Sequence, residues 1–599
     1  MSNDIIRNRI SLLRNEMKKA GIGVYMIPSD DDHASEYVND HFKCREWISG
    51  FTGSAGTVLV TDEDAWLWTD GRYFLQAAAE LEGSGIGLMK MGEPGVPTIQ
   101  EKLKELSGVT LGFDGSTMTA KEGSELEKIC GDIVFDKDLA GMIWEDRPSL
   151  DPSEIWEFPL TSAGRSFPEK LAAVRERMAD EHADVLLICD LMETAWLFNL
   201  RGADVQDTPV FYSYAIVTAD ECYLFTLPSA LSDGLKSKLK CLSVTCMDYD
   251  EAGKVLTDLC TGKCLWADPS KSSYSLLKPV QCASMIDKPT PVEMMKAVKN
   301  DTETAATRNA HLKDGVAETK FIYWLKQEMA ARKNTDSANP ITELSACDKL
   351  ESFRRAQDGC FDLSFPSIAG YMDNGAIIHY EPTPESDTEL KPEGLFLLDS
   401  GGQYIDGTTD ITRTIALGPL TDKMRRCYTL VLKGHIDLAM AVFTEGTTGK
   451  ELDLLARTPM KDAGMDYNHG TGHGVGHVLS VHEGPNYISF RNADTPIVPG
   501  MITSDEPGIY LEGEFGVRIE SEILCVVAPS GNDADDTPKC AFETITIVPL
   551  EREAIIPEML TEEELKWLND YHKRVYEAVS PRLTDEEAEW LREVTRPIG

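Results

Sequence analysis

The sequence predicts two similar α/β domains followed by a larger α+β domain. A repeat in the first half supports the duplication, because VTDEDAWLWT (60–69) returns as VTADECYLFT (217–226) with matching Val, Thr and Leu residues and aromatic inner positions. A repeat unit of this length indicates a duplicated domain rather than a solenoid. The second half instead combines helical patterns with glycine-punctuated, β-rich segments, which is typical of an α+β domain.

Each copy of the repeat contains the same elements in the same order. An amphipathic helix, an apolar strand and a glycine-bearing loop precede a strand, a polar turn and a second strand. The upstream elements fall at 3–19, 24–28 and 50–56 in the first copy, and at 168–181, 184–189 and 200–205 in the second. A segment rich in Pro, Ser and acidic residues (146–159) is expected to link the two copies.

A long helix is expected to begin at Asp301, with Asp301 or Thr302 as its cap. Its apolar face is predicted to contain Ala305, Leu312, Val316 and Tyr323. Hairpin signals then occur around AIIHY (376–380), LFLLDSGGQYIDG (395–407) and EILCVVAP (522–529), with helices near 420–443 and 449–463.

These patterns divide the chain into four parts. The expected boundaries are 1–158 and 159–297 for the two α/β domains, 298–552 for the α+β domain and 553–599 for an acidic, helical extension. Four aromatic residues are expected to pack the extension onto the protein: Trp567, Tyr571, Tyr576 and Trp590.

The composition is that of a large globular protein with an unusual charge. Of the 599 residues, 42% are hydrophobic and 26% are charged. The chain contains 58 basic and 100 acidic residues, which gives a net charge of −42. Such a field disfavours binding to nucleic acid or anionic membranes. No window approaches the ~20 apolar residues of a membrane span. The N-terminus lacks the apolar core of a secretory signal, and the scattered cysteines suit a reducing compartment, so a cytoplasmic location is expected.

Five side chains of metal-ligand type lie in short segments of the C-terminal half: Asp399, Asp410, His473, Glu506 and Glu520. Four carboxylates and one imidazole form an oxygen-dominated donor set for two hard or borderline divalent cations. Two such cations, ~3.5–4 Å apart, generate hydroxide and polarise a carbonyl. Because Asp399 and Asp410 flank a GGQYIDG turn, a hairpin can bring both to one metal pair. Asp406, within that turn, is expected to be solvated.

Other interpretations of the histidine-rich segment fail on local structure. HGTGH (469–473) and HGVGH (473–477) resemble helical HxxxH pairs, but their glycines make a helix unfavourable and no HExxH is present. The same segment lacks the GxGxxG register of a dinucleotide site. The glycines are instead expected to let the backbone approach a substrate closely.

A family resemblance is carried by HGTGHGVG (469–476), VHEGP (481–485), SDEPGIY (504–510) and GVRIE (516–520). In order and spacing these segments resemble the aminopeptidase P and prolidase group of pita-bread metallopeptidases. The resemblance extends to the long, three-domain cytosolic Xaa-Pro aminopeptidases through REWISGFTGSAGTVLV (45–60), FRRAQDGCFDLSF (353–365) and LTEEELKWLNDYHKRVYEA (560–578). It implies two creatinase-type N-terminal α/β domains followed by a pita-bread catalytic domain.

The resemblance also implies roles for individual residues. Asp399 would chelate one metal, Asp410 and Glu520 would bridge the pair, and His473 with Glu506 would hold the other. Glu506 would in addition shuttle a proton from the bridging water to the leaving nitrogen. Five further residues complete the expected site: His379, His469 and His482 would bind substrate or stabilise the tetrahedral intermediate, and Tyr510 and Arg518 would orient Asp399. His477 matches no such position.

The implied function is release of the N-terminal residue from peptides with proline in second position, by attack of a hydroxide that bridges two metal ions. Mn²⁺ is the expected metal, with Zn²⁺ or Co²⁺ as alternatives, and the family implies a homodimer. A prolidase specific for Xaa-Pro dipeptides is the alternative within the class, although the duplicated N-terminal half and C-terminal extension argue against it. A peptide- or protein-binding pita-bread module without catalysis is the alternative from another class. The retained ligand residues disfavour that module.

Overall fold

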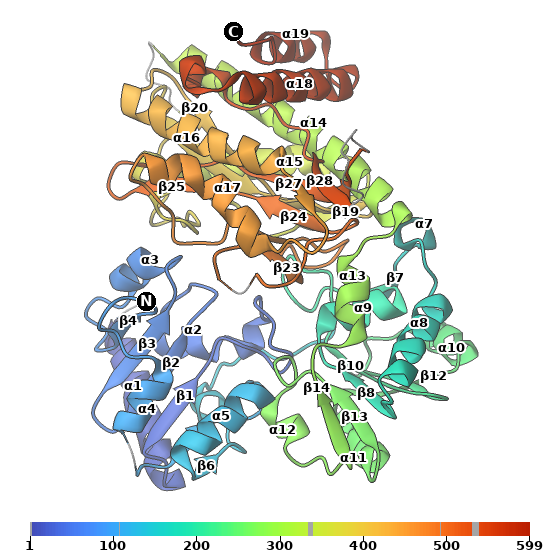
Figure 1. Cartoon of the computed structure of the whole chain (residues 1–599). Helices are drawn as coiled ribbons and strands as arrows, with labels where there is room; N and C mark the ends of the chain where they lie inside the picture. Colours follow the sequence, from blue (N-terminus) through green and yellow to red (C-terminus); the bar gives the residue numbers. More distant parts are fainter. Residues whose placement is uncertain (1–2, 107, 334–338, 492, 530–537) are drawn as a thin grey trace. The chain divides into compact units, whose positions relative to one another are not determined.

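The computed structural model describes residues 3–106, 108–333, 339–491, 493–529 and 538–599, which form two compact units (Figure 1). Unit 1 comprises Met1–Leu160 with Arg165–Glu293, and unit 2 comprises Thr161–Gly164 with Met294–Gly599. In the described segments, no helix combines the length and apolar character needed to cross a membrane. All fourteen cysteines lie in these segments and are free thiols.

Unit 1 contains two six-stranded sheets with equivalent strand orders, β4-β3-β2-β1-β5-β6 and β12-β11-β10-β8-β13-β14. The first sheet consists of β1 (Val24–Ile27), β2 (Thr57–Thr61), β3 (Ala65–Thr69), β4 (Gly87–Lys90), β5 (Leu111–Phe113) and β6 (Ile133–Val134). The second consists of β8 (Val185–Ile188), β10 (Ser213–Thr218), β11 (Cys222–Thr226), β12 (Val244–Asp248), β13 (Cys264–Ala267) and β14 (Ser284–Asp287).

The pairing pattern confirms that the two α/β folds are copies. The central strands β1 and β8 pair antiparallel with β2 and β10, and parallel with β5 and β13. The hairpin arms pair antiparallel as β2–β3 and β10–β11, and the outer arms β3 and β11 run parallel to β4 and β12. The hairpins β2–β3 and β10–β11 are the two sequence repeats, and their polar turns are the predicted ones. The sequence pattern therefore located the strands correctly.

A long helix precedes each sheet, as the amphipathic patterns predict. Helix α1 (Asn3–Ala20) buries Ile6, Ile10, Leu13 and Met17, and α8 (Phe167–Asp180) buries Leu171, Val174 and Met178. These spacings place the apolar side chains on one helix face. The shorter elements of this region are α2 (Cys44–Ser49), α3 (Phe74–Glu80), α4 (Ile99–Glu105), α5 (Ala120–Cys130), α6 (Leu139–Ile143), β7 (Trp156–Glu157), α7 (Leu160–Ala163), α9 (Leu191–Phe198), β9 (Leu200–Arg201), α10 (Asp233–Cys241), α11 (Ala252–Cys260), α12 (Tyr274–Leu277) and α13 (Pro291–Ala297).

Unit 2 is built on antiparallel strands. One six-stranded sheet has the order β21-β28-β27-β24-β22-β23, and a three-stranded sheet has the order β16-β17-β20. Two smaller sheets join β15-β18-β19 and β25-β26. The strands are β15 (Cys360–Leu363), β16 (Ile368–Tyr371), β17 (Leu395–Ser400), β18 (Gly402–Tyr404), β19 (Gly407–Thr408), β20 (Ile411–Ala416), β21 (Val442–Thr444), β22 (Gly472–Gly474), β23 (Glu483–Ile488), β24 (Ile502–Asp505), β25 (Gly508–Leu511), β26 (Phe515–Arg518), β27 (Ser521–Val527) and β28 (Lys539–Thr544).

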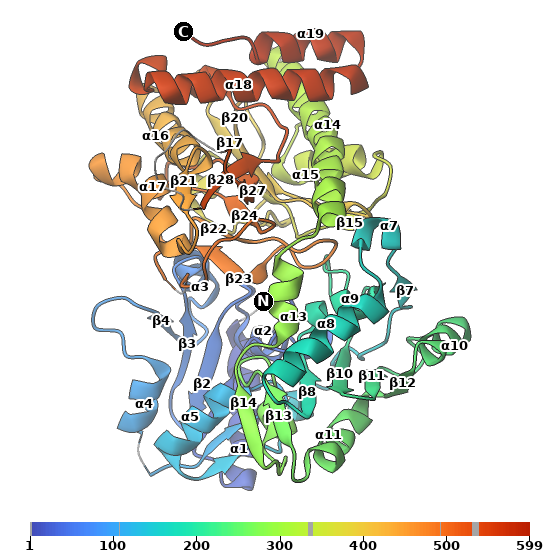
Figure 2. The ribbon, with the colours of Figure 1, turned by 45° about the vertical axis from the view of Figure 1, so that its right-hand side comes forward.

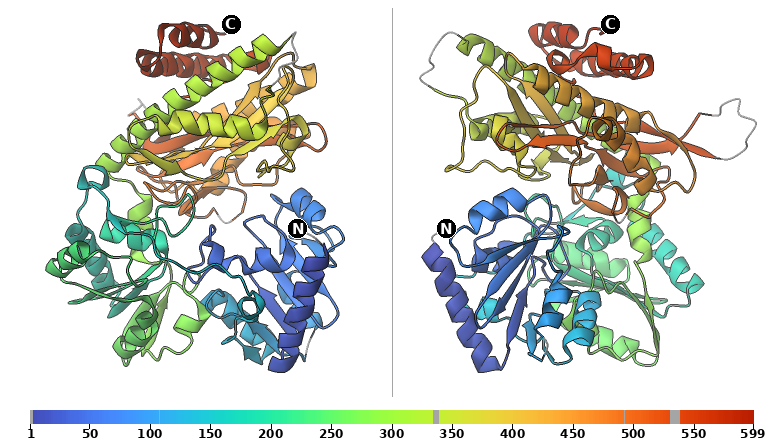
Figure 3. Two further views of the ribbon diagram at one scale, coloured as in Figure 1. Left: turned by 180° about the vertical axis from the view of Figure 1, so that it is seen from behind. Right: turned by 60° about the vertical axis from the view of Figure 1, so that its left-hand side comes forward.

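Helices cover both faces of these strands, as opposite views show (Figures 1 and 3). Helices α14 (Asp301–Arg332) and α15 (Glu343–Arg355) lie on one side, and α16 (Asp422–Ala439) and α17 (Gly449–Asp462) lie on the other. The predicted helices near 420–443 and 449–463 are thus confirmed. This sandwich of helices and antiparallel strands is the predicted α+β architecture.

Two details of the helix predicted to open the third domain are wrong. The helix cap is Asn300, whose side chain accepts hydrogen bonds from the backbone N–H groups of Thr302 and Glu303. Ala305 is exposed, because the inward face at the start of α14 is polar and includes Glu303 and Thr307. An apolar pattern could not reveal a buried face made of hydrogen-bonding side chains.

The AIIHY segment forms no hairpin strand. A 3₁₀ helix, η3 (Met372–Ala376), precedes it, and Ile377–Tyr380 follows without regular strand pairing. Asp406, in the expected hairpin turn, accepts hydrogen bonds from Lys313 and Asn309 of α14 rather than being merely solvated. Asp406 differs from the expectation because α14 supplies tertiary partners that the local pattern does not show.

The C-terminal region forms α18 (Glu562–Val579) and α19 (Asp585–Val594) after two short 3₁₀ turns, η4 (Arg552–Ala554) and η5 (Pro557–Met559), with η6 (Ser580–Arg582) between the helices. Figure 2 shows the two helices side by side, with α18 crossing the ends of α14 and α16. Capping boxes at Thr561 and Thr584 begin both helices. Tyr571 is buried at 3% exposure.

Candidate metal centre

Two of the predicted ligands come from neighbouring antiparallel strands. Asp399 lies in β17 opposite Thr412 of β20, and Asp410 immediately precedes β20. The chain between them leaves the sheet to form β18 and β19, and then returns. Asp399 is 7% exposed and Asp410 3%. The backbone N–H of Asp410 donates to Glu522 Oε1 at 2.9 Å, which fixes the residue where the excursion ends.

Glu520 is held between β26 and β27. Its Oε2 accepts a hydrogen bond from the Thr412 hydroxyl at 2.6 Å, and its backbone N–H donates to Thr412 O at 3.1 Å. Glu506 follows β24, where its backbone N–H donates to Thr471 O at 2.8 Å and its Oε1 accepts from the Ser504 hydroxyl at 3.3 Å. Each carboxylate is therefore oriented while keeping an oxygen for another ligand.

His473 presents Nε2 to the carboxylates. Its Nδ1 lies 3.0 Å from Gly474 O, so Nδ1 must carry the proton and donate it. The lone pair then belongs to Nε2, which lies 3.3 Å from Asp410 Oδ2 and 3.6 Å from Glu506 Oε1. This is the tautomer that a metal ligand requires.

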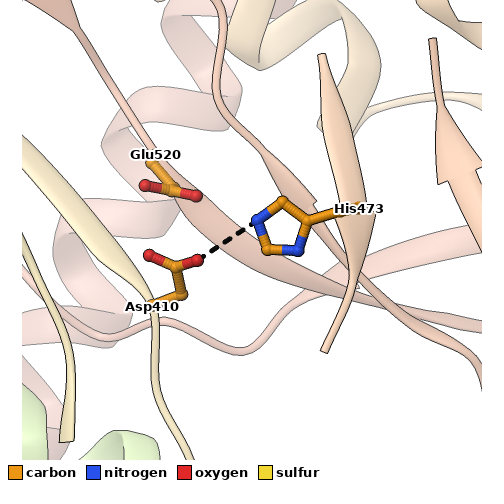
Figure 4. A group of neighbouring side chains, drawn as sticks. All are labelled: Asp410, His473 and Glu520. Atoms are coloured by element: carbon orange, nitrogen blue, oxygen red, sulfur yellow. Dashed lines mark ion pairs between the residues drawn. The ribbon is translucent and has the colours of Figure 1, made fainter. Parts of the chain in front are cut away.

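Asp410, His473 and Glu520 point toward one another (Figure 4). One ligand atom from each residue lies within 4.8 Å of the other two. The imidazole ring of His482 lies edge-on to that of His473, with their centroids 4.3 Å apart. The three donors form the inner part of the predicted five-residue set.

The electrostatics of the site call for cations. Burial, together with Asp399, raises the pKa of Asp410 well above its ordinary value. Burial also raises the pKa of Glu506 and of Glu520 well above the usual range, with Glu520 and Asp410 respectively as the largest charged contributors. Asp399 Oδ1 is buried with no hydrogen-bond partner among the described residues. An unpaired buried carboxylate oxygen beside three further carboxylates and a correctly oriented imidazole fits divalent cations.

Arg518 and Tyr510 form a chain of hydrogen bonds that runs from Asp399 to His469, a residue predicted to bind substrate. Arg518 donates from Nη2 to Asp399 Oδ2 at 2.6 Å and from Nη1 to the Tyr510 hydroxyl at 2.8 Å. The Tyr510 hydroxyl lies 2.9 Å from His469 Nε2, while His469 Nδ1 donates to Gly470 O. The Tyr510 hydroxyl therefore donates to Nε2. Burial raises the pKa of Tyr510 to about 12, so the hydroxyl keeps its proton.

The remaining histidines occupy different surroundings. His379 is half-buried in the segment after η3, and the neighbouring Ile378 O accepts a hydrogen bond from Arg518. His477 is 3% exposed; its Nδ1 lies 3.1 Å from the Thr307 hydroxyl and its Nε2 3.1 Å from Ser162 O. His477 thus fastens the glycine-rich segment to α14 and to the 161–164 segment, a role that sequence reasoning left open.

Sequence reasoning missed a layer of residues behind the donors. Glu522 accepts from Asp410 N and lies 3.0 Å from His311 Nε2. The only sequence feature that could have indicated Glu522 is its position: it stands two residues after Glu520 and therefore on the same face of an extended chain. Arg354, fully buried, donates to Asp314, Glu318 and Ser400 O behind the hairpin that carries Asp399.

Close backbone contacts explain two of the glycines. A Cβ at Gly472 would lie 1.9 Å from Ser504 O, and one at Gly474 would lie 2.2 Å from Glu483 O. Both distances are too short for any other residue. The glycines therefore allow the strands on either side of His473 to approach, which confirms that the HGTGHGVG segment is not helical.

Family models match four segments of the chain. Metallopeptidase family M24 matches residues 305–526, and the C-terminal region of peptidase M24 matches 538–598. The creatinase/prolidase N-terminal domain matches twice, at 9–148 and 146–303. The fold is that of an M24 metallopeptidase, a metal-dependent hydrolase.

Similar proteins narrow the class further. Aminopeptidase P2 of Arabidopsis thaliana is 38% identical over 99% of this chain and 89% of its own length. Xaa-Pro aminopeptidase 1 of Dictyostelium discoideum is 39% identical over 99% of this chain and 97% of its own length. The crystal structure of X-prolyl aminopeptidase from Caenorhabditis elegans, a cytosolic enzyme with a di-nuclear active site, superposes with a TM-score of 0.94 at 32% identity over 100% of both chains. This chain belongs to the Xaa-Pro aminopeptidase family.

Proposed function

We propose that this protein hydrolyses the bond between the first residue and a following proline in peptides. The observation that carries the proposal is the convergence of Asp410, His473 and Glu520 within 4.8 Å in a chain that is a full-length relative of Xaa-Pro aminopeptidases. Asp399 and Glu506 complete the proposed ligand set. When bound, two divalent cations supply a water of lowered pKa and polarise the substrate carbonyl.

The protein's own groups would supply proton transfer. Glu506 Oε1 lies 3.6 Å from His473 Nε2, beside the candidate metal donors, where a carboxylate could take up a proton and pass it on. Proline's nitrogen forms a tertiary amide without an N–H and needs a proton to leave. We assign Glu506 as the group that delivers that proton.

The histidines around the donors would bind the substrate. His469 receives a hydrogen bond at Nε2 from Tyr510, which itself receives one from Arg518. His482 lies against the His473 ring. His379 and His482 would donate to the developing oxyanion, and each such hydrogen bond could contribute about 3 kcal/mol to lowering the barrier. His469, whose Nδ1 donates to Gly470 O and whose Nε2 accepts from Tyr510, would line the substrate site without donating to the oxyanion.

The acidic centre also favours a free N-terminus. Four carboxylates, two divalent cations and one hydroxide would sum to a charge of about −1, which a peptide ammonium would complement. We therefore propose that N-terminally blocked peptides are rejected. The requirement for a free N-terminus distinguishes an aminopeptidase from an endopeptidase.

A matched set of peptides tests the proposal. Metal-loaded protein is incubated with Arg-Pro-Pro, Arg-Ala-Pro, Arg-Pro and acetyl-Arg-Pro-Pro, and released arginine is measured. We expect efficient release from Arg-Pro-Pro, much less from Arg-Ala-Pro and Arg-Pro, and none from the acetylated peptide. The rigid proline ring presents the carbonyl with little loss of entropy, which is why alanine should be inferior. Preference for Arg-Pro would favour a prolidase, and no release at all would favour a binding module.

Four further proposals concern the metal, the cellular location, the oligomeric state and the domain boundaries. We propose Mn²⁺ as the metal, to be tested by metal analysis of the purified protein; affinity alone would favour zinc, so availability must decide. We propose a cytoplasmic homodimer, to be tested by fractionation of cells and by light scattering. We also propose the domain boundaries 1–158, 159–297, 298–552 and 553–599, to be tested by limited proteolysis.

A further inference from the structure

Helix α18, the first helix of the C-terminal extension, reaches the interior of unit 2 through Tyr571. The Tyr571 hydroxyl donates to Val548 O at 2.7 Å and accepts from Arg413 Nη2 at 3.0 Å. Tyr571 is 3% exposed and Arg413 2%. A tyrosine hydroxyl buried this deeply is expected to have defined partners, and here one of them is a guanidinium.

Arg413 connects that hydroxyl to the candidate metal centre. Its Nη1 donates to Thr412 O at 2.9 Å and also to Glu520 O. Thr412 in turn donates its hydroxyl to the Glu520 carboxylate. One planar guanidinium therefore fixes both backbones that orient Glu520, and Tyr571 holds the guanidinium from the side of α18.

A second contact runs from the same helix toward Glu506. Trp567 stacks on Tyr571 with ring centroids 5.2 Å apart and planes 4° from parallel. Trp567 also lies edge-on to His435, at a centroid distance of 6.0 Å. His435 Nδ1 is 3.0 Å from Asp505 Oδ2, and Asp505 immediately precedes Glu506.

We propose that the C-terminal extension is a positioning element of the metal centre. Through Tyr571 and Trp567, α18 fixes the segments that carry Glu520 and Glu506, so that metal affinity depends on side chains of the extension that touch neither metal nor substrate. Residues that orient ligands typically change metal affinity by roughly 10–100-fold when removed. The inference rests on the proposed function only in that these carboxylates bind metal.

Two tyrosines of the same helix provide a matched test. Tyr571→Phe removes the hydroxyl that accepts a hydrogen bond from Arg413, whereas Tyr576→Phe removes one that accepts a hydrogen bond from Arg592 of α19. Binding of Mn²⁺ to metal-free protein is measured by titration calorimetry, and unfolding of the metal-free forms by differential scanning. We expect Tyr571→Phe to weaken metal binding about 10-fold and Tyr576→Phe to leave it unchanged.

The comparison separates positioning from general stabilisation. If Tyr571→Phe lowers the unfolding temperature but keeps the wild-type metal affinity, the inference is wrong. Equal losses of affinity in both variants would also overturn it. Should Tyr571→Phe fail to fold, Arg413→Lys is the second variant, since its ammonium cannot contact all the acceptors of the guanidinium; unchanged metal affinity there would refute the proposal. Wild-type protein that binds no metal would instead refute the proposed function.

Discussion

Thr412 and Glu520 hold each other through two hydrogen bonds: the Thr412 hydroxyl donates to Glu520 Oε2 at 2.6 Å, and Glu520 N donates to Thr412 O at 3.1 Å. One bond orients the carboxylate and the other fixes the backbone beneath it. The pair thus joins β20 to the chain between β26 and β27 at the point where the donors meet.

Thr412→Val should weaken metal binding by about 10-fold or more, because the isosteric change removes only the hydroxyl that orients Glu520. Calorimetric titration of the metal-free protein with Mn²⁺ measures the effect. Thr429→Val is the control, since Thr429 is equally buried but its hydroxyl bonds to backbone carbonyls of Arg425 and Ala554. Similar affinities for both variants would show that the hydroxyl of Thr412 does not orient a ligand.

Glu506→Gln should reduce kcat by about 10²–10⁴-fold while the protein still folds, because an amide retains an oxygen donor but cannot carry the proton. Turnover of Arg-Pro-Pro is measured alongside metal content. A variant that keeps both its metals and most of its turnover would assign proton transfer to another residue.

Metal binding should release protons, and it should tighten as the pH rises. Burial raises the pKa of Asp410, Glu506 and Glu520 in the metal-free protein, so protons occupy sites that cations must take. Calorimetry in buffers of different ionisation enthalpy counts the released protons. Binding without proton release would mean that these carboxylates are already ionised.

The same shifts predict how metal-free stability depends on pH. A carboxylate whose folded-state pKa is raised contributes fully below its unfolded pKa, about 4.3 for Glu, and that contribution is lost as the pH rises through the folded value. These carboxylates should therefore make the metal-free protein less stable as the pH rises above the unfolded value, and added Mn²⁺ should stabilise it more at the higher pH. Thermal unfolding at a series of pH values, with and without metal, measures both effects.

His572 should make stability fall in acid. Burial, then Arg552 and Arg413, lower the pKa of His572 to about 3, while its neutral Nε2 accepts from Leu550 N. Because the unfolded imidazole, with a pKa of about 6.5, takes up its proton first, this contribution is complete above that pH and declines toward pH 3 by up to ~1.4 kcal/mol per pH unit. His572→Gln keeps an acceptor without titrating. Denaturant unfolding between about pH 4 and 7 should show a flatter slope for the variant, and identical slopes would contradict this assignment.

The sequence was sufficient to predict the duplicated sheets. Alternating large residues around two polar turns located β2–β3 and β10–β11, because strand periodicity is a local property. The five predicted donors fall on segments that the fold brings together, although their individual roles remain proposals. Family resemblance, rather than periodicity, supplied those roles.

Residues behind the donors could not be predicted, since their importance comes from tertiary hydrogen bonds. Thr412 and Arg413 have no local signature, because each acts on a donor from a different strand, and Glu522 is marked only by its position two residues after Glu520. The misplaced face of α14 has the same origin: Glu303 and Thr307 are buried as polar residues, whereas Ala305 is exposed. Local hydropathy describes apolar burial and gives no indication of a polar interior.

The donors are spread over β17, β22 and the residues next to β20, β24 and β27, and this spread determines when the metal can enter. No short segment of the nascent chain contains a complete site, so tight binding must follow folding of unit 2 rather than guide it. We infer that the ions available where folding finishes decide which metal the protein carries, because the donor set itself accepts several. Refolding the metal-free chain in competing mixtures of Mn²⁺ and Zn²⁺ would test this: a final metal content that ignores the ratio supplied would show that the site selects its own metal.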